Sequence, residues 1–107
     1  CAVAMRDALL RGDVGAVGEI LAENWRHQRA LGPEMETAAM RTLADVAARA
    51  GAKAFKACGS GAGGCLVFLA PPGEEHAVGE ALREAGGTVL KFTFDQSGVE
   101  AWTCQER

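Results

Sequence analysis

A glycine-rich run, Gly59-Ser60-Gly61-Ala62-Gly63-Gly64, has the residue types needed to hold a small anion. Four of its six residues lack a side chain, so the backbone can adopt positive φ angles and approach a ligand or a neighbouring loop closely. Successive uncovered backbone N–H groups also form a cradle for phosphate. We expect this run to line a phosphate or substrate site, with the Ser60 hydroxyl donating either to phosphate or to backbone. The alternative is a tight connection, although two residues are enough for a plain hairpin.

The residues after the run distinguish it from the best-known phosphate loops. In dinucleotide-binding and Walker-type loops the glycines lead into a helix. Here they lead into a short continuous apolar run, residues 65–70, which is typical of a buried strand. The sequence therefore predicts a strand–glycine loop–strand unit.

Four side chains outside the run are candidate substrate contacts. Lys56 precedes the loop and would be a counter-charge for phosphate, or else a solvated strand lysine. Arg26 and Arg29 are three residues apart and share a helix face, which suits a clamp for a sugar phosphate or an ordinary surface pair. Trp25 falls on the apolar stripe of the same helix, so stacking on a substrate competes with packing in the core.

Composition limits the class of protein. The 107 residues fit one domain, 1–107, and the net charge of −3 argues against a general binder of nucleic acid or anionic membranes. No apolar stretch approaches the length of a membrane span and no signal peptide is visible, so we expect a cytoplasmic protein. The four cysteines form no CxxC pair, which favours reduced thiols over a zinc site. A disulfide between Cys58 and Cys65, which flank the glycine run, is left open.

The first half of the chain is predicted to be helical. Gly12 ends a first helix, and Asp13 is the expected N-cap of a second. Gly32-Pro33 ends the second helix, because proline cannot continue its hydrogen bonding. Thr37 is the expected N-cap of a third helix, which ends at Gly51.

The second half alternates between strands and a helix. Strands are predicted at 53–58 and 65–70, a helix follows Glu74-Glu75, and further strands are predicted at 88–94 and 99–104. The expected order is three helices, two strands, a helix and two strands. This order predicts an α+β domain with helices on one face of a mainly antiparallel sheet.

The sequence resembles a known family over most of its length. The segment from Lys56 to Leu66 is similar to the third conserved motif of the GHMP kinases, and the resemblance extends from about Ala8 through Val99. It includes the Gly12-Asp13 helix junction. The stretch Asn24-Trp25-Arg26-His27-Gln28-Arg29-Ala30-Leu31 looks most like the bacterial sugar kinases of the heptose-phosphate type.

The resemblance implies a fold, an activity and partners. Family members transfer the γ-phosphoryl group of ATP to a small metabolite. Their N-terminal domain supplies a Pro-x-x-x-Gly-Leu-Gly-Ser-Ser-Ala phosphate loop and usually an aspartate base and an acidic Mg²⁺ ligand. Their C-terminal domain is a ferredoxin-like layer whose glycine loop packs beside the phosphate site. This chain matches only the second half and contains no Pro-x-x-x-Gly-Leu-Gly-Ser-Ser-Ala run.

Two hypotheses follow. In the first, the chain is the C-terminal domain of an ATP- and Mg²⁺-dependent sugar or sugar-phosphate kinase. It would work with an N-terminal domain in cis or as a split subunit, contain no catalytic or metal-ligating residue, and be inactive alone. In the second, the chain is a free-standing α+β regulatory module that binds a small anionic ligand without catalysis.

Overall fold

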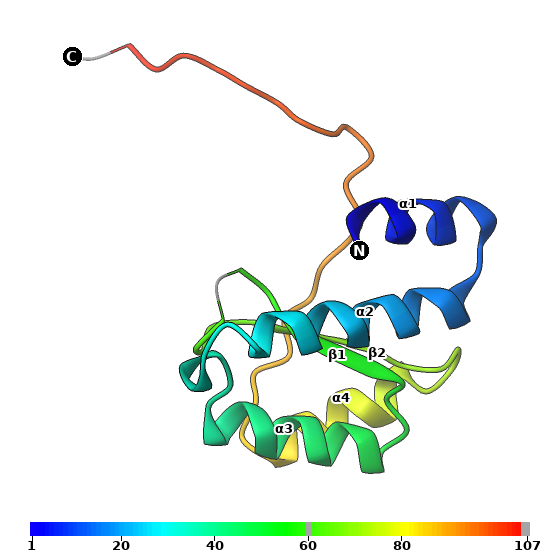
Figure 1. Ribbon diagram of the computed structural model, residues 1–107, viewed down its shortest axis with the longest axis vertical. Helices are drawn as coiled ribbons and strands as arrows, with labels where there is room; N and C mark the ends of the chain where they lie inside the picture. Colours follow the sequence, from blue (N-terminus) through cyan, green and yellow to red (C-terminus); the bar gives the residue numbers. More distant parts are fainter. Residues whose placement is uncertain (60, 106–107) are drawn as a thin grey trace.

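Helices and one β-hairpin make up the structure, a computed structural model that describes residues 1–59 and 61–105 (Figure 1). The α+β class predicted from the sequence is confirmed, and so is the antiparallel pairing of the two strands. The elements in chain order are α1 (Ala2–Arg11), α2 (Val14–Arg29), the 3₁₀ helix η1 (Pro33–Met35), α3 (Ala38–Arg49), β1 (Ala54–Ala57), β2 (Leu66–Leu69) and α4 (Glu75–Glu84).

Local signals set the helix boundaries. Gly12 follows α1 with a φ of 68°, which glycine adopts without strain. Asp13 caps α2 by accepting a hydrogen bond from the Ala16 amide at 3.0 Å. Thr37 caps α3 in the same way, with the Met40 amide 3.2 Å from its hydroxyl oxygen. The two predicted N-caps are therefore confirmed, and only the short η1 helix was not expected.

The core lies where α2, α3 and the hairpin meet. The strands pair in a register that places Phe55 opposite Phe68, with their rings stacked at 5.5 Å between centroids. Trp25 of α2 lies 5.8 Å from the Phe55 ring. The buried side chains of Trp25, Met40 and Ala57 form a cluster, against which Phe55 and Leu66 pack. Removing these apolar surfaces from water stabilises the fold.

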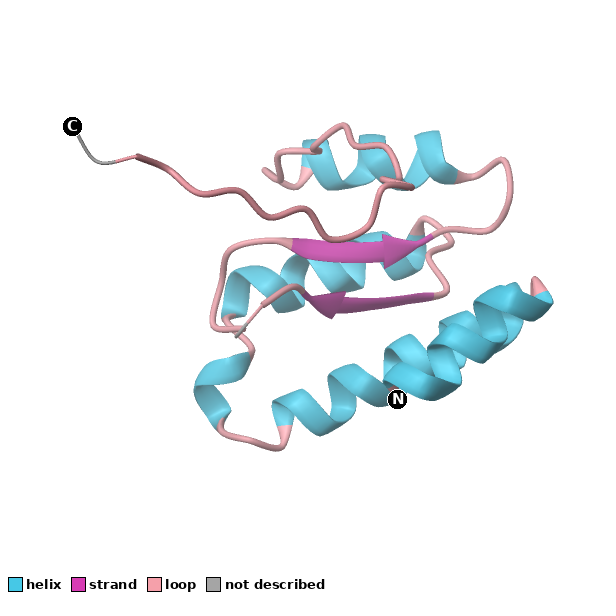
Figure 2. Ribbon diagram, turned by 90° about the horizontal axis from the view of Figure 1, so that it is seen from above, coloured by secondary structure: helices cyan, strands magenta, loops and turns pink. Residues whose placement is uncertain are grey.

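Helices lie on both sides of the hairpin rather than on one face. Figure 1 shows α1 and α2 on one side and α3 and α4 on the other, and Figure 2 shows the strands between α2 and α4. α2 runs along β1 and contacts both faces of the hairpin. Its Trp25 meets Phe55, whereas its Gly18 lies against Leu69, whose side chain points to the opposite face because neighbouring strand residues alternate. A ferredoxin-like layer stays a prediction.

The prediction of strands at 88–94 and 99–104 was wrong for this structure. The chain after α4 forms no regular element over residues 88–105; it runs past the hairpin and α1, and its far part then extends away from the helices (Figure 1). Apolar alternation does not form a strand unless the backbone pairs with a neighbouring strand, and in the described chain only β1 and β2 pair. Its large apolar side chains are consequently exposed: Leu90 by 64%, Phe92 by 73%, Phe94 by 84%, Val99 by 99% and Trp102 by 79%.

Candidate functional site

The glycine-rich run forms the loop that joins β1 to β2. The Cys58 amide donates a hydrogen bond to the Cys65 carbonyl oxygen at 2.9 Å and closes the base of the loop. Above this bond the backbone is left-handed: φ is 72° at Gly59, 88° at Gly61, 64° at Ala62, 132° at Gly63 and 82° at Gly64. Ser60, a predicted site residue, lies outside the described residues.

This backbone explains the composition of the loop. Glycine adopts positive φ without the steric penalty that a Cβ imposes. Ala62 is the one non-glycine residue of the described chain with a positive φ, so a contact elsewhere must compensate for its strain. Its amide donates to the Met35 carbonyl oxygen at 3.1 Å, and this bond holds Ala62 in place.

The loop is docked on the end of α2 and on η1. The side-chain amide of Gln28 donates to the Gly59 carbonyl oxygen at 3.1 Å. A Cβ at Gly61 would lie 3.1 Å from Gln28 Nε2 and 3.2 Å from Met35 Sδ. Gly61 is therefore required both by its φ and by the close approach of these two neighbours.

The Gly63 and Gly64 amides of the loop are open to a ligand. Within the described residues, the amides of Gly63 and Gly64 donate to no backbone carbonyl, and a Cβ at either position would meet nothing within 4 Å. Uncovered N–H groups in a left-handed backbone are typical of anion-binding loops. The loop can therefore offer donors to an anion while its other side is fixed to the protein.

The aromatic and basic candidates on α2 have different environments. Trp25 is only 2% exposed, so its ring is a core residue, and its Nε1 has no hydrogen-bond partner among the described residues. The Arg29 guanidinium lies 5.8 Å from the centre of the Trp25 ring, within the range of a cation–π interaction. Arg26 is exposed. The structure thus brings Trp25 and Arg29 together at the end of α2 that supports the glycine loop.

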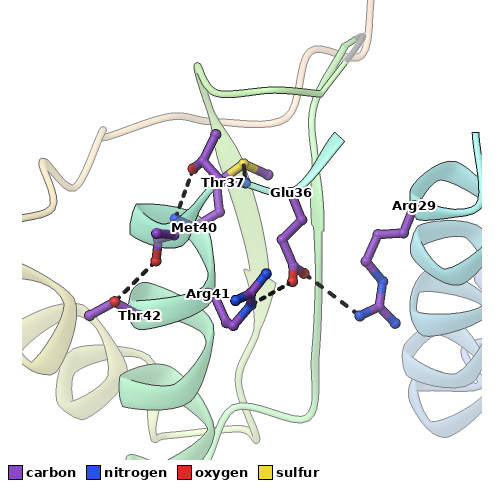
Figure 3. Close-up of polar contacts among 7 residues, drawn as sticks. Arg29, Glu36, Thr37, Met40, Arg41 and Thr42 are labelled. Carbon is purple, nitrogen blue, oxygen red and sulfur yellow. Dashed lines mark hydrogen bonds and ion pairs between the residues drawn. The ribbon is translucent and has the colours of Figure 1, made fainter. Parts of the chain in front are cut away.

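Glu36 connects two helices at this end of the molecule. Its carboxylate lies 3.1 Å from Arg41 Nε on α3 and 3.7 Å from Arg29 on α2 (Figure 3). The Glu36 side chain is 14% exposed, whereas the two arginines are about half exposed or more. The shielded carboxylate holds the η1 segment between α2 and α3.

Sequence reasoning missed the residues that support the loop. Gln28 was not singled out, although it lies one helical turn after Trp25 and could have been placed near the core on that ground. Met35 acts through its backbone carbonyl, which no side-chain pattern reveals. The role of Glu36 could not be predicted from the sequence, because its two arginine partners come from separate helices.

Lys56 lies on the α1 side of the hairpin. Its side chain is half buried and lines a shallow hollow between α1, α2 and β1, together with Met5, Leu21 and Asn24. Strand alternation explains this position, because Phe55 and Ala57 point to the core while Lys56 points to the opposite face.

Some features are absent from residues 1–59 and 61–105. No three His, Cys, Asp or Glu side chains gather there to hold a metal ion. None of the helices described is both long enough and apolar enough to cross a membrane. All four cysteines are free thiols and exposed, so Cys58 and Cys65 are not bonded to each other.

The chain is similar to known kinases over most of its length. The family described as "GHMP kinases C terminal" matches residues 5–88. The D-glycero-alpha-D-manno-heptose 7-phosphate kinase of Campylobacter jejuni is 32% identical over 101 residues, which are 94% of this chain and 30% of that protein. The mevalonate kinase of Pyrococcus abyssi is 35% identical over 83 residues, which are 78% of this chain and 24% of that protein. The chain spans less than a third of the length of either relative.

Proposed function

Because this chain belongs to the GHMP kinases through the C-terminal domain of that family, we propose that it is the C-terminal part of an ATP-dependent kinase for a sugar phosphate. The observation that carries the proposal is the 32% identity to a heptose 7-phosphate kinase over 94% of the chain. The substrate we propose is a heptose phosphate or a closely related sugar phosphate. Mevalonate is the comparison substrate, because a mevalonate kinase is also similar.

We assign the glycine loop the role of lining the phosphate or substrate site. Its support is the left-handed backbone of Gly61 to Gly64 and the amides of Gly63 and Gly64, which donate to no backbone carbonyl among residues 1–59 and 61–105. Phosphoryl transfer depends mainly on positioning and on stabilising the charge of the moving group, and backbone N–H groups contribute both. Arg26 and Arg29, on the helix that supports the loop, are proposed substrate contacts, and Lys56, which lines the hollow beside α1, is a weaker candidate.

The proposed kinase needs a second, N-terminal domain. The chain covers 30% of the heptose 7-phosphate kinase and 24% of the mevalonate kinase. The exposed apolar side chains of residues 88–105 are the kind of surface that a partner covers. We propose that this domain holds ATP and its Mg²⁺, as the resemblance to the family implies.

The test is an ATP-dependent phosphorylation assay of the full-length polypeptide that contains this chain. Heptose 7-phosphate, the corresponding unphosphorylated heptose and mevalonate are offered as acceptors, and ADP release is measured. Turnover that strongly prefers heptose 7-phosphate supports the proposal. Preference for mevalonate would overturn the proposed substrate class. No ADP release with any acceptor would overturn the proposed kinase activity.

Ligand binding by the 107-residue chain alone distinguishes the kinase proposal from the alternative of a regulatory module. Calorimetry with ATP and with inorganic phosphate is expected to show no tight binding, because the donors of the loop are only part of the proposed site. Tight binding of either ligand by this chain alone would favour a free-standing module that recognises an anion without catalysis.

A further inference from the structure

The glycine loop is fixed on one side by two contacts from a single stretch of chain. The Gln28 side chain donates to the Gly59 carbonyl oxygen, and the Met35 carbonyl oxygen accepts from the Ala62 amide, each at 3.1 Å. These contacts reach Gly59, at the start of the left-handed part of the loop, and Ala62, which directly precedes Gly63 and Gly64. The position of the Gly63 and Gly64 amides, which follow Ala62 directly, therefore depends on residues 28–35 as well as on the hairpin.

This supporting stretch is itself held by Glu36. The Met35 carbonyl belongs to the residue before Glu36, and the Glu36 carboxylate lies between Arg29 of α2 and Arg41 of α3 (Figure 3). A carboxylate that is 14% exposed and paired with two guanidinium groups is screened less by water than a surface pair. Releasing it would free the Met35 carbonyl to move, and the loop with it.

We propose that Gln28 and Glu36 are positioning residues for the glycine loop, and that together they set the affinity of the proposed phosphate or substrate site. Gln28 acts directly on the loop, and Glu36 acts through Met35. This inference rests on the proposed function only for the identity of the ligand. The positioning of the loop is a property of the chain itself and is measurable without a substrate.

The ion pairs also constrain Arg29. With its guanidinium held between Glu36 and the Trp25 ring, Arg29 is oriented at the supported side of the loop. Neutralising Glu36 would remove this restraint as well as the anchor of Met35. The same substitution is therefore expected to weaken ligand binding by two routes.

The experiment compares Glu36→Gln with Glu34→Gln in the full-length protein. Glu34 lies on η1, is exposed, and forms no ion pair within the described chain, so it controls for the loss of one carboxylate. Amide hydrogen exchange is measured by mass spectrometry on peptides that cover residues 59–66. We expect exchange in the loop to become about fivefold to tenfold faster in Glu36→Gln and to be unchanged in Glu34→Gln.

Steady-state kinetics provide a second readout. Glu36→Gln is expected to raise the KM for heptose 7-phosphate about threefold to tenfold with kcat within about twofold, because it moves a binding loop and removes no reacting group. Gln28→Ala, which leaves the ion pairs intact, is expected to reproduce both effects. It also keeps the test decisive if Glu36→Gln does not fold.

The outcomes separate this inference from the proposed function. Faster loop exchange together with a raised KM in both Glu36→Gln and Gln28→Ala would support it. Loop exchange equal to that of Glu34→Gln in both variants would overturn it, even in a fully active kinase. A wild-type protein without kinase activity would overturn the proposed function, while the exchange comparison would still decide whether these residues position the loop.

Discussion

The Gln28 side-chain amide lies 3.1 Å from the Gly59 carbonyl oxygen and joins the last turn of α2 to the glycine loop, 31 residues later in the chain. The same stretch of chain reaches the loop again where the Met35 carbonyl oxygen accepts from the Ala62 amide. The loop is therefore a docked structure with one attached side and one open side. The contacts on the attached side should affect the stability of the fold, and the amides on the open side should affect ligand binding.

Gly61 is expected to tolerate substitution less well than another glycine of similar φ. Gly61 and Gly73 have φ values of 88° and 84°, but a Cβ at Gly73 meets nothing within 4 Å. Each alanine substitution should cost about 1–2 kcal/mol from left-handed strain. Gly61→Ala should cost about 1 kcal/mol more, because its Cβ presses on Gln28 and Met35. Urea unfolding of the 107-residue chain measures the difference, and equal costs would contradict the docking of the loop.

The same pair of sites separates activity from stability in the full-length protein. Gly61→Val should lower kcat/KM by about 100-fold or more, because a displacement of the loop misplaces its donors. Gly73→Val, in the turn before α4, should leave kcat/KM near that of the wild type. Near-normal turnover by Gly61→Val would contradict the assignment of the loop to the active site.

The two tryptophans are expected to differ strongly in their effect on stability. Trp25 is 2% exposed and packs on Phe55, whereas Trp102 is 79% exposed. Trp25→Ala should lower the unfolding free energy by about 3–5 kcal/mol through loss of burial and a residual cavity. Trp102→Ala should change it by no more than about 0.5 kcal/mol. Denaturant unfolding followed by circular dichroism compares them, and a small effect at Trp25 would argue that its ring is not part of the core.

Glycines inside helices offer a test of the packing between α2 and β2. A Cβ at Gly79 of α4 would meet nothing within 4 Å, whereas one at Gly18 of α2 would lie 3.3 Å from Leu69 Cδ2. Gly79→Ala should therefore raise the unfolding free energy by about 0.5–1 kcal/mol, the usual gain for replacing a helical glycine. Gly18→Ala should gain less or lose stability, because Leu69 must shift. An equal gain at both sites in thermal unfolding would show that α2 is not tightly packed there.

The segment after α4 should make the 107-residue chain self-associate. Phe92 and Phe94 are 73% and 84% exposed and contact each other edge to face, with 5.7 Å between ring centroids. Light scattering is expected to detect oligomers whose population grows with concentration. Replacing both residues by serine should shift the chain toward monomer without a loss of helix content. A strictly monomeric and highly soluble wild-type chain would count against an uncovered partner surface.

The sequence by itself determined the local structure of this protein. Asp13 and Thr37 end stretches of non-helical backbone and supply the oxygen that the first free amides of a helix need, so both helix starts could be predicted. The glycines at 59, 61, 63 and 64 marked the left-handed loop for a similar reason, since that backbone suits glycine best. Each of these signals depends on atoms only a few residues apart.

Only the tertiary structure decided which parts of the chain meet. Residues 88–94 have the alternating pattern that is typical of a strand. A strand also needs hydrogen bonds to a neighbouring strand, and the structure has none there. Lys56 and Gln28 show the same limit: Lys56 is close to the loop in sequence but faces the hollow beside α1, whereas Gln28 is distant in sequence but touches the loop. Local signals set the helix starts and the left-handed loop, whereas strand pairing and the contacts of a site depend on how helices and strands pack.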